Sequence, residues 1–379
     1  MRIVIASDKF KGSATGPEVA AALADGIHDV LPDAVVEAVP VADGGEGTID
    51  AALAAGFSPV DATVTGPTGE PVVARFAVRG AEAIVEMAAA SGLDVLPRGE
   101  KAALTATSRG TGELILAALD RGCRDIVLGV GGSACTDGGA GMLHALGASL
   151  QTETGEATSG GAALAGLASV DLAGLDPRLE ETSFVLASDV DNPLLGERGA
   201  AAVFAPQKGA SDDDVIVLEQ GLTRFADLLE RSAGVTSSIE VPGAGAAGGV
   251  GYAALAVLRA RRERGVEVVL RLTGLAARIA GADLVITGEG SLDGQSLGGK
   301  TPVGVATLAG ETGIPVIAVC GHSALSADEA AGAGFSAVYA LSALEPEKER
   351  SMANAVPLLR EVGRTIARER IAVDSDVAS

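Results

Sequence analysis

Aromatic side chains are scarce in this sequence. It has no Trp, two Tyr and seven Phe among 379 residues, although 47% of all residues are hydrophobic. We therefore expect a core packed from Val, Ile, Leu and Ala, and this aliphatic content excludes a disordered chain. The shortage of rings also argues against a stacking surface for single-stranded nucleic acid.

Cysteine, histidine and positive charge are in short supply as well. The three cysteines form no CxxC pair and their odd number argues against a disulfide framework, while the three histidines show no metal-binding spacing. The net charge of −22 argues against nucleic-acid partners. No apolar run approaches the roughly 18 residues of a membrane span, and the first residues predict a strand, not a signal peptide. We therefore expect a cytoplasmic protein without nucleic-acid or membrane partners.

Short β-branched runs alternate with Ala- and Leu-rich helical stretches at both ends of the chain. This pattern is typical of an α/β fold with mostly parallel strands. The expected strands are 3–7, 35–41, 283–287, 315–319 and 336–341, and the expected helices are 16–31, 302–312, 326–333 and 351–370. Five strands with intervening helices match a flavodoxin-like sheet.

The middle of the chain has a different pattern. Residues 60–87 predict two or three antiparallel strands, and residues 151–180 are more loosely patterned. The other elements expected here are helices at 111–121, 139–147, 211–233, 249–264 and 271–280 and strands at 125–130 and 183–188. We expect a flavodoxin-like domain made of residues 1–60 and 281–379, with a second α/β domain, residues 61–280, inserted into it.

Glycine and lysine point to anion binding. The 52 glycines gather in the segments 42–48, 129–141, 196–209, 243–251 and 288–304, and such loops let backbone N–H groups approach a phosphate. The sequence has only six lysines, and four of them lie in or beside these loops or strand ends: Lys9, Lys11, Lys208 and Lys300. Lysine suits phosphate as a mobile point charge.

Carboxylates follow three of the expected strands. The acidic and amide residues at these strand ends are Asp43, Glu46, Asp189, Asp191, Asn192, Glu289 and Asp293. Carboxylates beside a phosphate-binding loop are what Mg²⁺ and a base that activates a hydroxyl require. Capping and turn formation are the structural alternative for the same residues.

Two short patterns have weaker support. Residues 294–301 fit the P-loop pattern GxxxxGK[ST], but the expected strand stops near Thr287 and nearby carboxylates would crowd the phosphates, so only a role for Lys300 near phosphate is retained. Residues 243–248 fit GxGxxG after an expected strand, SSIEVP, and leave dinucleotide binding as an alternative. Cys135 is expected to be a small buried residue.

Taken together, the loops resemble the type I glycerate kinase family nearly from end to end. The segments that carry the resemblance are SDKFKGS (7–13), PVADGGEGT (40–48), TGELI (111–115), GVGGSACTDGGAGML (129–143), SDVDNPLLGERGAAAVFAPQKGA (188–210), PGAGAAGGVGYA (242–253) and DLVITGEGSLDGQSLGGKTPVGVA (283–306). The chain departs from the family at Cys135-Thr136, usually Thr-Asn, and at Ser291, often Arg; Lys300 or Arg109 are the candidates to replace that arginine.

The resemblance implies phosphorylation of D-glycerate by ATP and Mg²⁺, with 2-phosphoglycerate favoured over 3-phosphoglycerate as product. We expect the site in the cleft between the two domains, with Asp189, Asp191 and Lys9 as catalytic residues and the two aspartates as metal ligands. The expected substrate-binding residues are Lys11, Ser13, Asp43, Gly44, Arg109 and Asn192. The expected nucleotide-binding residues are Gly243, Gly245, Gly248, Gly288, Glu289, Gly290, Asp293, Lys300 and Lys208. An NAD-dependent hydroxy-acid dehydrogenase and a non-catalytic nucleotide- or sugar-acid-binding protein remain as alternatives, and a homodimer stays open.

Overall fold

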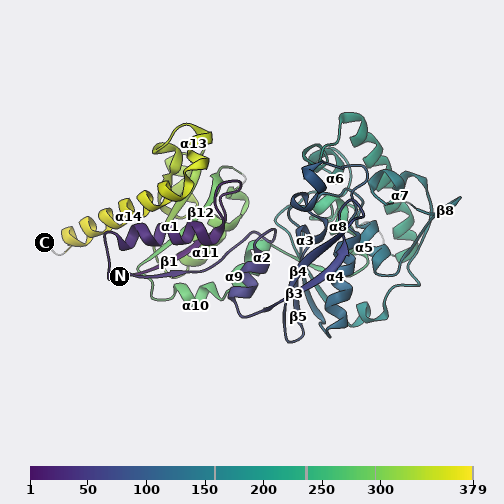
Figure 1. Cartoon of the computed structure of the whole chain (residues 1–379), viewed down its shortest axis with the longest axis horizontal. Coiled ribbons are helices and arrows are strands. Elements are labelled where there is room, and N and C mark those ends of the chain that lie inside the picture. The colour runs from purple at the N-terminus through teal and green to yellow at the C-terminus, as the bar shows by residue number, and fades with distance from the viewer. Residues whose placement is uncertain (158, 235–237, 295, 378–379) are drawn as a thin grey trace. The chain divides into compact units, whose positions relative to one another are not determined.

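The chain divides into two compact units. The computed structural model describes all residues except 158, 235–237, 295 and 378–379. Met1–Asp43 and Val266–Ser379 form one unit, here the discontinuous unit, and Gly44–Gly265 form the inserted unit (Figure 1). The expected boundaries were therefore misplaced: residues 44–60 belong to the inserted unit and residues 266–280 to the discontinuous one.

The discontinuous unit is built on a five-stranded parallel sheet. Its strands are β1 (Arg2–Ser7), β2 (Val35–Ala38), β12 (Leu284–Leu292), β13 (Val316–Ser323) and β14 (Phe335–Ala340). Their order in space is β2-β1-β12-β13-β14, which is the flavodoxin-like order. The register pairs Ile3 with Leu284 and Ile5 with Ala38, so that a strand from the start of the chain lies between β2 and a strand from its last third. The expected α/β fold class is confirmed.

Helices cover this sheet. They are α1 (Gly16–His28), α9 (Gly265–Leu272), α10 (Leu275–Ile279), α11 (Thr301–Gly310), α12 (Ala327–Gly332), α13 (Lys348–Ala353) and α14 (Ala355–Val377). Helices α1 and α14 lie side by side (Figure 1). Their backbones approach so closely that a Cβ atom on Gly26 would lie 2.0 Å from the Arg360 carbonyl oxygen. The expected helix 271–280 is instead two helices, because Gly274 adopts φ +62° between them.

The inserted unit contains a mixed six-stranded sheet in the order β11-β10-β6-β5-β4-β3. The strands are β3 (Ser58–Thr65), β4 (Pro71–Arg79), β5 (Glu82–Glu86), β6 (Asp125–Gly129), β10 (Ser183–Ala187) and β11 (Arg261–Glu263). Strands β3, β4 and β5 are antiparallel neighbours, as expected for residues 60–87, and β5, β6, β10 and β11 are parallel. The loosely patterned stretch forms most of a small sheet of β7 (Ser149–Thr152), β8 (Gly155–Glu156) and β9 (Leu167–Asp171).

For one helix expected in this unit, the prediction of its second half is wrong. The helices here are α2 (Thr48–Ala54), α3 (Ala88–Ser91), α4 (Arg109–Asp120), α5 (Ala140–Ala145), α6 (Ala200–Phe204), α7 (Asp212–Ala233) and α8 (Ala246–Ala256). The expected helix 249–264 ends with α8, because Arg259 turns the backbone to φ +53° and the next residues pair with β10 as strand β11. Sheet pairing thus overrides the helical preference of residues 259–264, whose sequence is RARRER.

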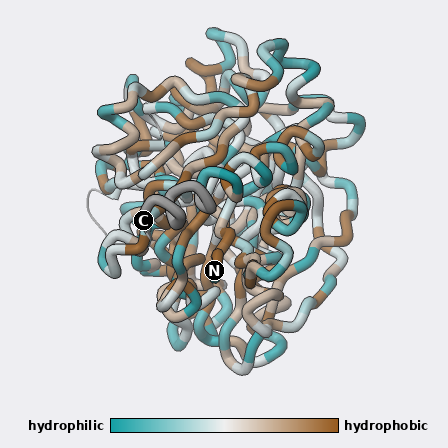
Figure 2. The backbone as a smooth tube through the Cα atoms, turned by 90° about the vertical axis from the view of Figure 1, so that its left-hand side faces the viewer, coloured by the Kyte–Doolittle hydropathy of each residue, from teal (hydrophilic) through white to brown (hydrophobic). Residues whose placement is uncertain are grey.

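Packing follows the aliphatic composition. The backbone trace coloured by hydropathy shows hydrophilic residues at many of its turns (Figure 2). Of the few rings, Phe225 and Tyr252 are fully buried in the inserted unit and meet edge to face, with centroids 6.5 Å apart. No helix among the described residues has both the length and the apolar character to cross a membrane.

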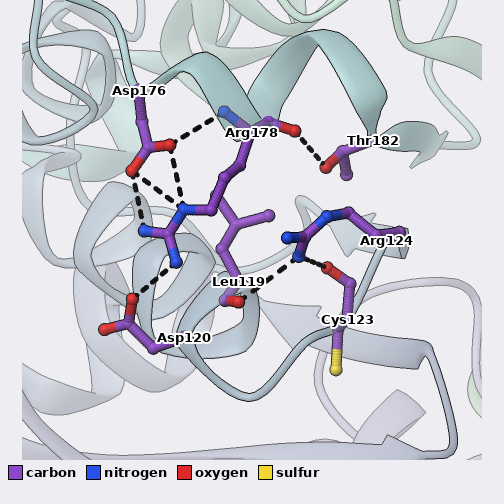
Figure 3. Close-up of polar contacts among 7 residues, drawn as sticks. All are labelled: Leu119, Asp120, Cys123, Arg124, Asp176, Arg178 and Thr182. Atoms are coloured by element: carbon purple, nitrogen blue, oxygen red, sulfur yellow. Dashed lines mark hydrogen bonds and ion pairs between the residues drawn. The ribbon is translucent and has the colours of Figure 1, made fainter.

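Two arginines, Arg124 and Arg178, make structural contacts near the amino ends of β6 and β10. Arg178 forms ion pairs with Asp176 at 2.7 Å and with Asp120 at 2.8 Å, and Arg124 donates to the Leu119 and Cys123 carbonyls at the end of α4 (Figure 3). These groups cap a helix and tie loops together. They lie at the sheet end opposite the Gly-rich loops that follow the strands.

Candidate functional site

The discontinuous unit gathers charged residues at the carboxyl edge of its sheet, where the strand order reverses between β1 and β12. Ligands bind at this position in open α/β sheets. These charged residues are Asp8, Lys9, Asp43, Glu289 and Lys300, and together with the Thr301 hydroxyl they are here called the switch-point cluster. Lys9, Asp43, Glu289 and Lys300 were expected site residues, whereas Asp8 and Thr301 were missed.

Asp8 is held on both carboxylate oxygens. The Lys9 backbone N–H donates to Oδ1 at 2.7 Å and the Thr301 hydroxyl donates to Oδ2 at 3.1 Å. Burial, together with the nearby Asp43 carboxylate, raises the pKa of the Asp8 carboxyl to about 7. Asp8 directly follows a buried strand, which is the same pattern that marked the other expected carboxylates, but only Lys9, Lys11 and Ser13 were expected in this segment.

Glu289 and Lys300 attract each other electrostatically within the switch-point cluster. Burial raises the pKa of the Glu289 carboxyl, with smaller contributions from Asp43 and Asp293, while Ser296 and Lys300 oppose the rise. The Glu289 Oε1 atom is buried with no hydrogen-bond partner among the described residues. A cationic side chain beside an under-satisfied carboxylate indicates a site that is completed by a ligand.

The expected loop 288–300 begins as a strand. Strand β12 continues to Leu292, so Gly288, Glu289 and Gly290 are strand residues and the expected stop near Thr287 was wrong. A Cβ atom on Gly288 would lie 2.0 Å from the Val319 carbonyl oxygen of β13, which explains that glycine by sheet packing. Within the P-loop match, Gln295 lies outside the described residues; Lys300 occupies the N-cap position of α11 and Thr301 is the first residue of that helix.

Three other expected residues lie in nearby turns or at the cluster's margin. Lys11 is exposed and Ser13 is half-buried, in a tight turn closed by a Phe10 N–H to Ala14 carbonyl bond of 2.8 Å. Asp293 follows β12, and its backbone N–H donates to the Ser296 hydroxyl at 3.1 Å. All three therefore belong to the same unit as the switch-point cluster.

In the inserted unit, Asp189, Asp191 and Asn192 follow β10 as expected. The Gly265 backbone N–H, at the start of α9, donates to Asp189 Oδ1 at 2.9 Å. Arg262 Nη2 lies 2.5 Å from Asp191 Oδ1, and the Asn192 amide donates to the Arg198 carbonyl at 2.7 Å. Sequence reasoning missed Arg262 because it placed this residue in the expected helix 249–264, whereas the residue lies in strand β11.

Lys208 does not lie where a phosphate would reach it. Its side chain is buried, with the residue 1% exposed, and Nζ donates to the Cys135 carbonyl at 2.5 Å. Burial lowers the pKa of this ammonium. The assignment of Lys208 to nucleotide binding is therefore corrected to an internal structural role. Cys135 is fully buried, as expected.

Arg109 and Gly44 are also engaged within the inserted unit. Arg109 begins α4 and pairs with Glu113 one turn later at 2.9 Å. Gly44 adopts φ +84°, and a Cβ atom there would lie 2.6 Å from the Gly265 Cα atom. Both residues thus have structural reasons for their identity.

The GxGxxG match is explained by packing. A Cβ atom on Gly245 would lie 2.2 Å from the Pro193 carbonyl oxygen, and one on Gly243 would lie 2.8 Å from the Arg262 Cδ atom. The described residues before it, 238–242, form no strand, and Ser237 of the expected strand lies outside the described residues. The βαβ context that dinucleotide binding needs is therefore not present in the described part of this segment.

Gly248→Ala is expected to lower the free energy of unfolding by about 2–4 kcal/mol. Gly248 adopts φ +68°, and a Cβ atom would lie 2.2 Å from the Cys135 carbonyl oxygen. Urea unfolding measures the effect. Gly166→Ala, in the same unit with no atom within 4 Å of its Cβ position, is the matched control and should leave the midpoint unchanged. Equal midpoints for the two variants would contradict the packing explanation.

Comparison with known proteins identifies the family of this chain. The model of the glycerate kinase family matches residues 3–370. A glycerate kinase from Bacillus subtilis (strain 168) is 44% identical over 371 residues, covering 97% of both chains. A glycerate 2-kinase from Escherichia coli (strain K12) is 47% identical over 325 residues, covering 85% of both chains.

A solved structure agrees with these relatives. The crystal structure described as a glycerate kinase 2 from Salmonella typhimurium LT2 has a TM-score of 0.81 at 43% sequence identity and covers 99% of both chains. The resemblance of the loop motifs is thus confirmed over nearly the whole length. The chain belongs to the glycerate kinase family, whose members are ATP-dependent kinases.

Proposed function

We propose that this chain phosphorylates D-glycerate with ATP and yields 2-phosphoglycerate in preference to 3-phosphoglycerate. The observation that carries the proposal is the switch-point cluster, which sets two lysines among carboxylates at the ligand-binding edge of a flavodoxin-like sheet, in a chain of this family. Phosphoryl transfer needs positioning and charge neutralisation, and a site of this composition provides both.

The chemistry of each side chain suggests its part. Lys300 and the amino end of α11 suit the ATP phosphates, because a helix amino terminus and an ammonium both attract anions. Lys9 and Lys11 suit the glycerate carboxylate or the phosphoryl group in transfer. In the inserted unit, Arg262 provides a further cation beside Asp191.

Magnesium is implied by the family, and the two expected ligands fit it differently. Among the described residues no group of three or more His, Cys, Asp and Glu is arranged to hold a metal, but Mg²⁺ commonly takes only one or two carboxylates and fills its shell with phosphate oxygens and water. Asp189 fits this role as a half-buried carboxylate after a strand. Asp191 does not, because its carboxylate faces Arg262. When bound, Mg²⁺ neutralises charge on the phosphates.

Incubation with D-glycerate and MgATP is expected to release ADP, measured by a coupled assay, with L-glycerate as the stereochemical control. Proton-coupled phosphorus NMR of the product distinguishes the two hydroxyls. A phosphate on the secondary hydroxyl gives a doublet from its single neighbouring proton, and a phosphate on the primary hydroxyl gives a triplet. Binding without ADP release, or a change in nicotinamide absorbance with glycerate and NAD, would contradict the proposal and favour one of the two alternatives.

A further inference from the structure

Asp8 stands out in the switch-point cluster because two donors fix the direction of its carboxylate. The Thr301 hydroxyl comes from the first residue of α11 and the Lys9 N–H from the chain just after β1. The Asp8 backbone N–H is itself bonded to the Gly288 carbonyl of β12 at 2.9 Å. Thr301 is 1% exposed, so its hydroxyl has little access to competing solvent. The carboxylate is thus anchored between the two strands at which ligands are expected.

The charges around Asp8 come from several elements. Asp43 follows β2 and disfavours ionisation of Asp8, while the Lys9 ammonium favours it. The Glu289 carboxylate on β12 interacts with Asp43 and with Lys300, which precedes α11. With burial as the largest influence, the pKa of the Asp8 carboxyl is raised to about 7, so this group titrates near neutral pH. A group poised in this way is suited to accept and release protons.

Resting on the proposed function, we propose that Asp8 is the general base of the reaction and that Thr301 is its positioning residue. The glycerate hydroxyl oxygen forms a bond to the γ-phosphorus of ATP as its proton passes to Asp8. The bond between the γ-phosphorus and the bridging oxygen to the β-phosphorus breaks, and ADP leaves with that electron pair. Asp8 then releases the proton to solvent, so the products are phosphoglycerate, ADP and one proton.

Other carboxylates fit this role less well. The Asp191 carboxylate is already engaged in an ion pair with Arg262 at 2.5 Å. Asp189 accepts the N–H at the start of α9 and is the carboxylate proposed above for the metal. Glu289 belongs to the same cluster and is the internal competitor, so Glu289→Gln is the comparison that separates the two candidates.

The decisive experiment is the pH dependence of kcat/KM for D-glycerate at saturating MgATP. The wild type is expected to lose activity below a midpoint near pH 7. Thr301→Val removes a hydrogen bond to the charged form, so the midpoint should move up by about one pH unit, whereas Thr301→Ser should restore it. A phosphate group titrates in the same range, but its ionisation is the same for every variant, so the difference between variants isolates Asp8.

Asp8→Asn tests the base directly. We expect kcat to fall by about 10²–10⁴-fold at all pH values while the melting transition is retained. Thr307→Val is the matched control: Thr307 lies on the same helix, is exposed and donates only to the Val303 carbonyl, so the profile should be unchanged.

Three outcomes would overturn the assignment of Asp8. They are Asp8→Asn with kcat within fivefold of wild type, a Thr301→Val midpoint equal to that of wild type, or loss of the acid limb in Glu289→Gln. In each of them the wild type still makes phosphoglycerate. A wild-type protein that makes no phosphoglycerate instead contradicts the proposed function, so the two failures are distinguishable.

Discussion

Asp137→Ala is expected to lower the free energy of unfolding by about 3–5 kcal/mol, because it empties the centre of a buried polar network in the inserted unit. Asp137 is 1% exposed. Its carboxylate accepts the Ser108 N–H at 2.8 Å, the Ser108 hydroxyl at 2.9 Å and the N–H groups of Gly139 and Gly141 at 3.1 and 3.2 Å. Without the carboxylate these donors are buried and unsatisfied, and each costs free energy.

The electrostatic balance adds to the loss. The buried Lys208 ammonium interacts favourably with Asp137, so removal of the aspartate leaves a buried positive charge with less compensation. Urea unfolding of the full chain measures the effect. Asp125→Ala, which removes an exposed carboxylate from the same unit, is the control and should shift the midpoint little.

Asp137→Asn sharpens this test. The asparagine has nearly the same size but turns an NH₂ group toward donors, so we expect a loss close to that of alanine. An alanine variant within about 1 kcal/mol of wild type would show that the network contributes little net stability.

Lys9→Ala is expected to lower kcat/KM for D-glycerate by about 10²–10³-fold with an unchanged melting temperature. The residue follows β1 at the point where the strand order reverses, and its ammonium is one of two in the switch-point cluster. Loss of a preorganised charge that stabilises a transferring phosphoryl group has effects of this size. The coupled ADP-release assay measures the change.

Lys348→Ala is the matched control for Lys9. Lys348 is an exposed lysine in the same unit, on α13, so its removal makes the same change in net charge. We expect kcat/KM within about twofold of wild type, as is usual for surface substitutions. Equal activity of the two variants would exclude contact between Lys9 and the reacting groups.

The sheet of the discontinuous unit was predictable because its three central strands, β1, β12 and β13, contain short, buried, apolar runs. The run 3–6, for example, is fully buried and is followed by a helical stretch, which is typical of a central strand in a parallel sheet. Boundaries were less predictable where sheet pairing decides them. Strand β11 consists of Arg and Glu residues, and β12 continues through Gly288 and Gly290, so composition alone indicated a helix and a loop.

The sequence predicted which types of residue form the site better than it predicted the role of each residue. Lysines and carboxylates after strands indicated anion chemistry, and Lys9, Asp43, Glu289 and Lys300 do share one edge. Lys208 was wrong because a sequence does not show that a lysine in a Gly-rich segment points inward to the Cys135 carbonyl. Asp8 was missed because its poised charge depends on burial and on Asp43, which is distant in sequence and adjacent in space.

The placement of β1 between β2 and β12 has a consequence for synthesis on the ribosome. One of the two strand partners of β1, β12, and the helix that packs on α1, α14, lie more than 250 residues downstream, whereas the inserted unit is a continuous stretch. Since domains generally fold as units while the chain emerges, the inserted unit is complete before β12, the second neighbour of β1, has been synthesised. The inserted unit is therefore expected to fold first, although the discontinuous unit contains the start of the chain. Until the last third of the chain has emerged, β1 and α1 need protection from aggregation.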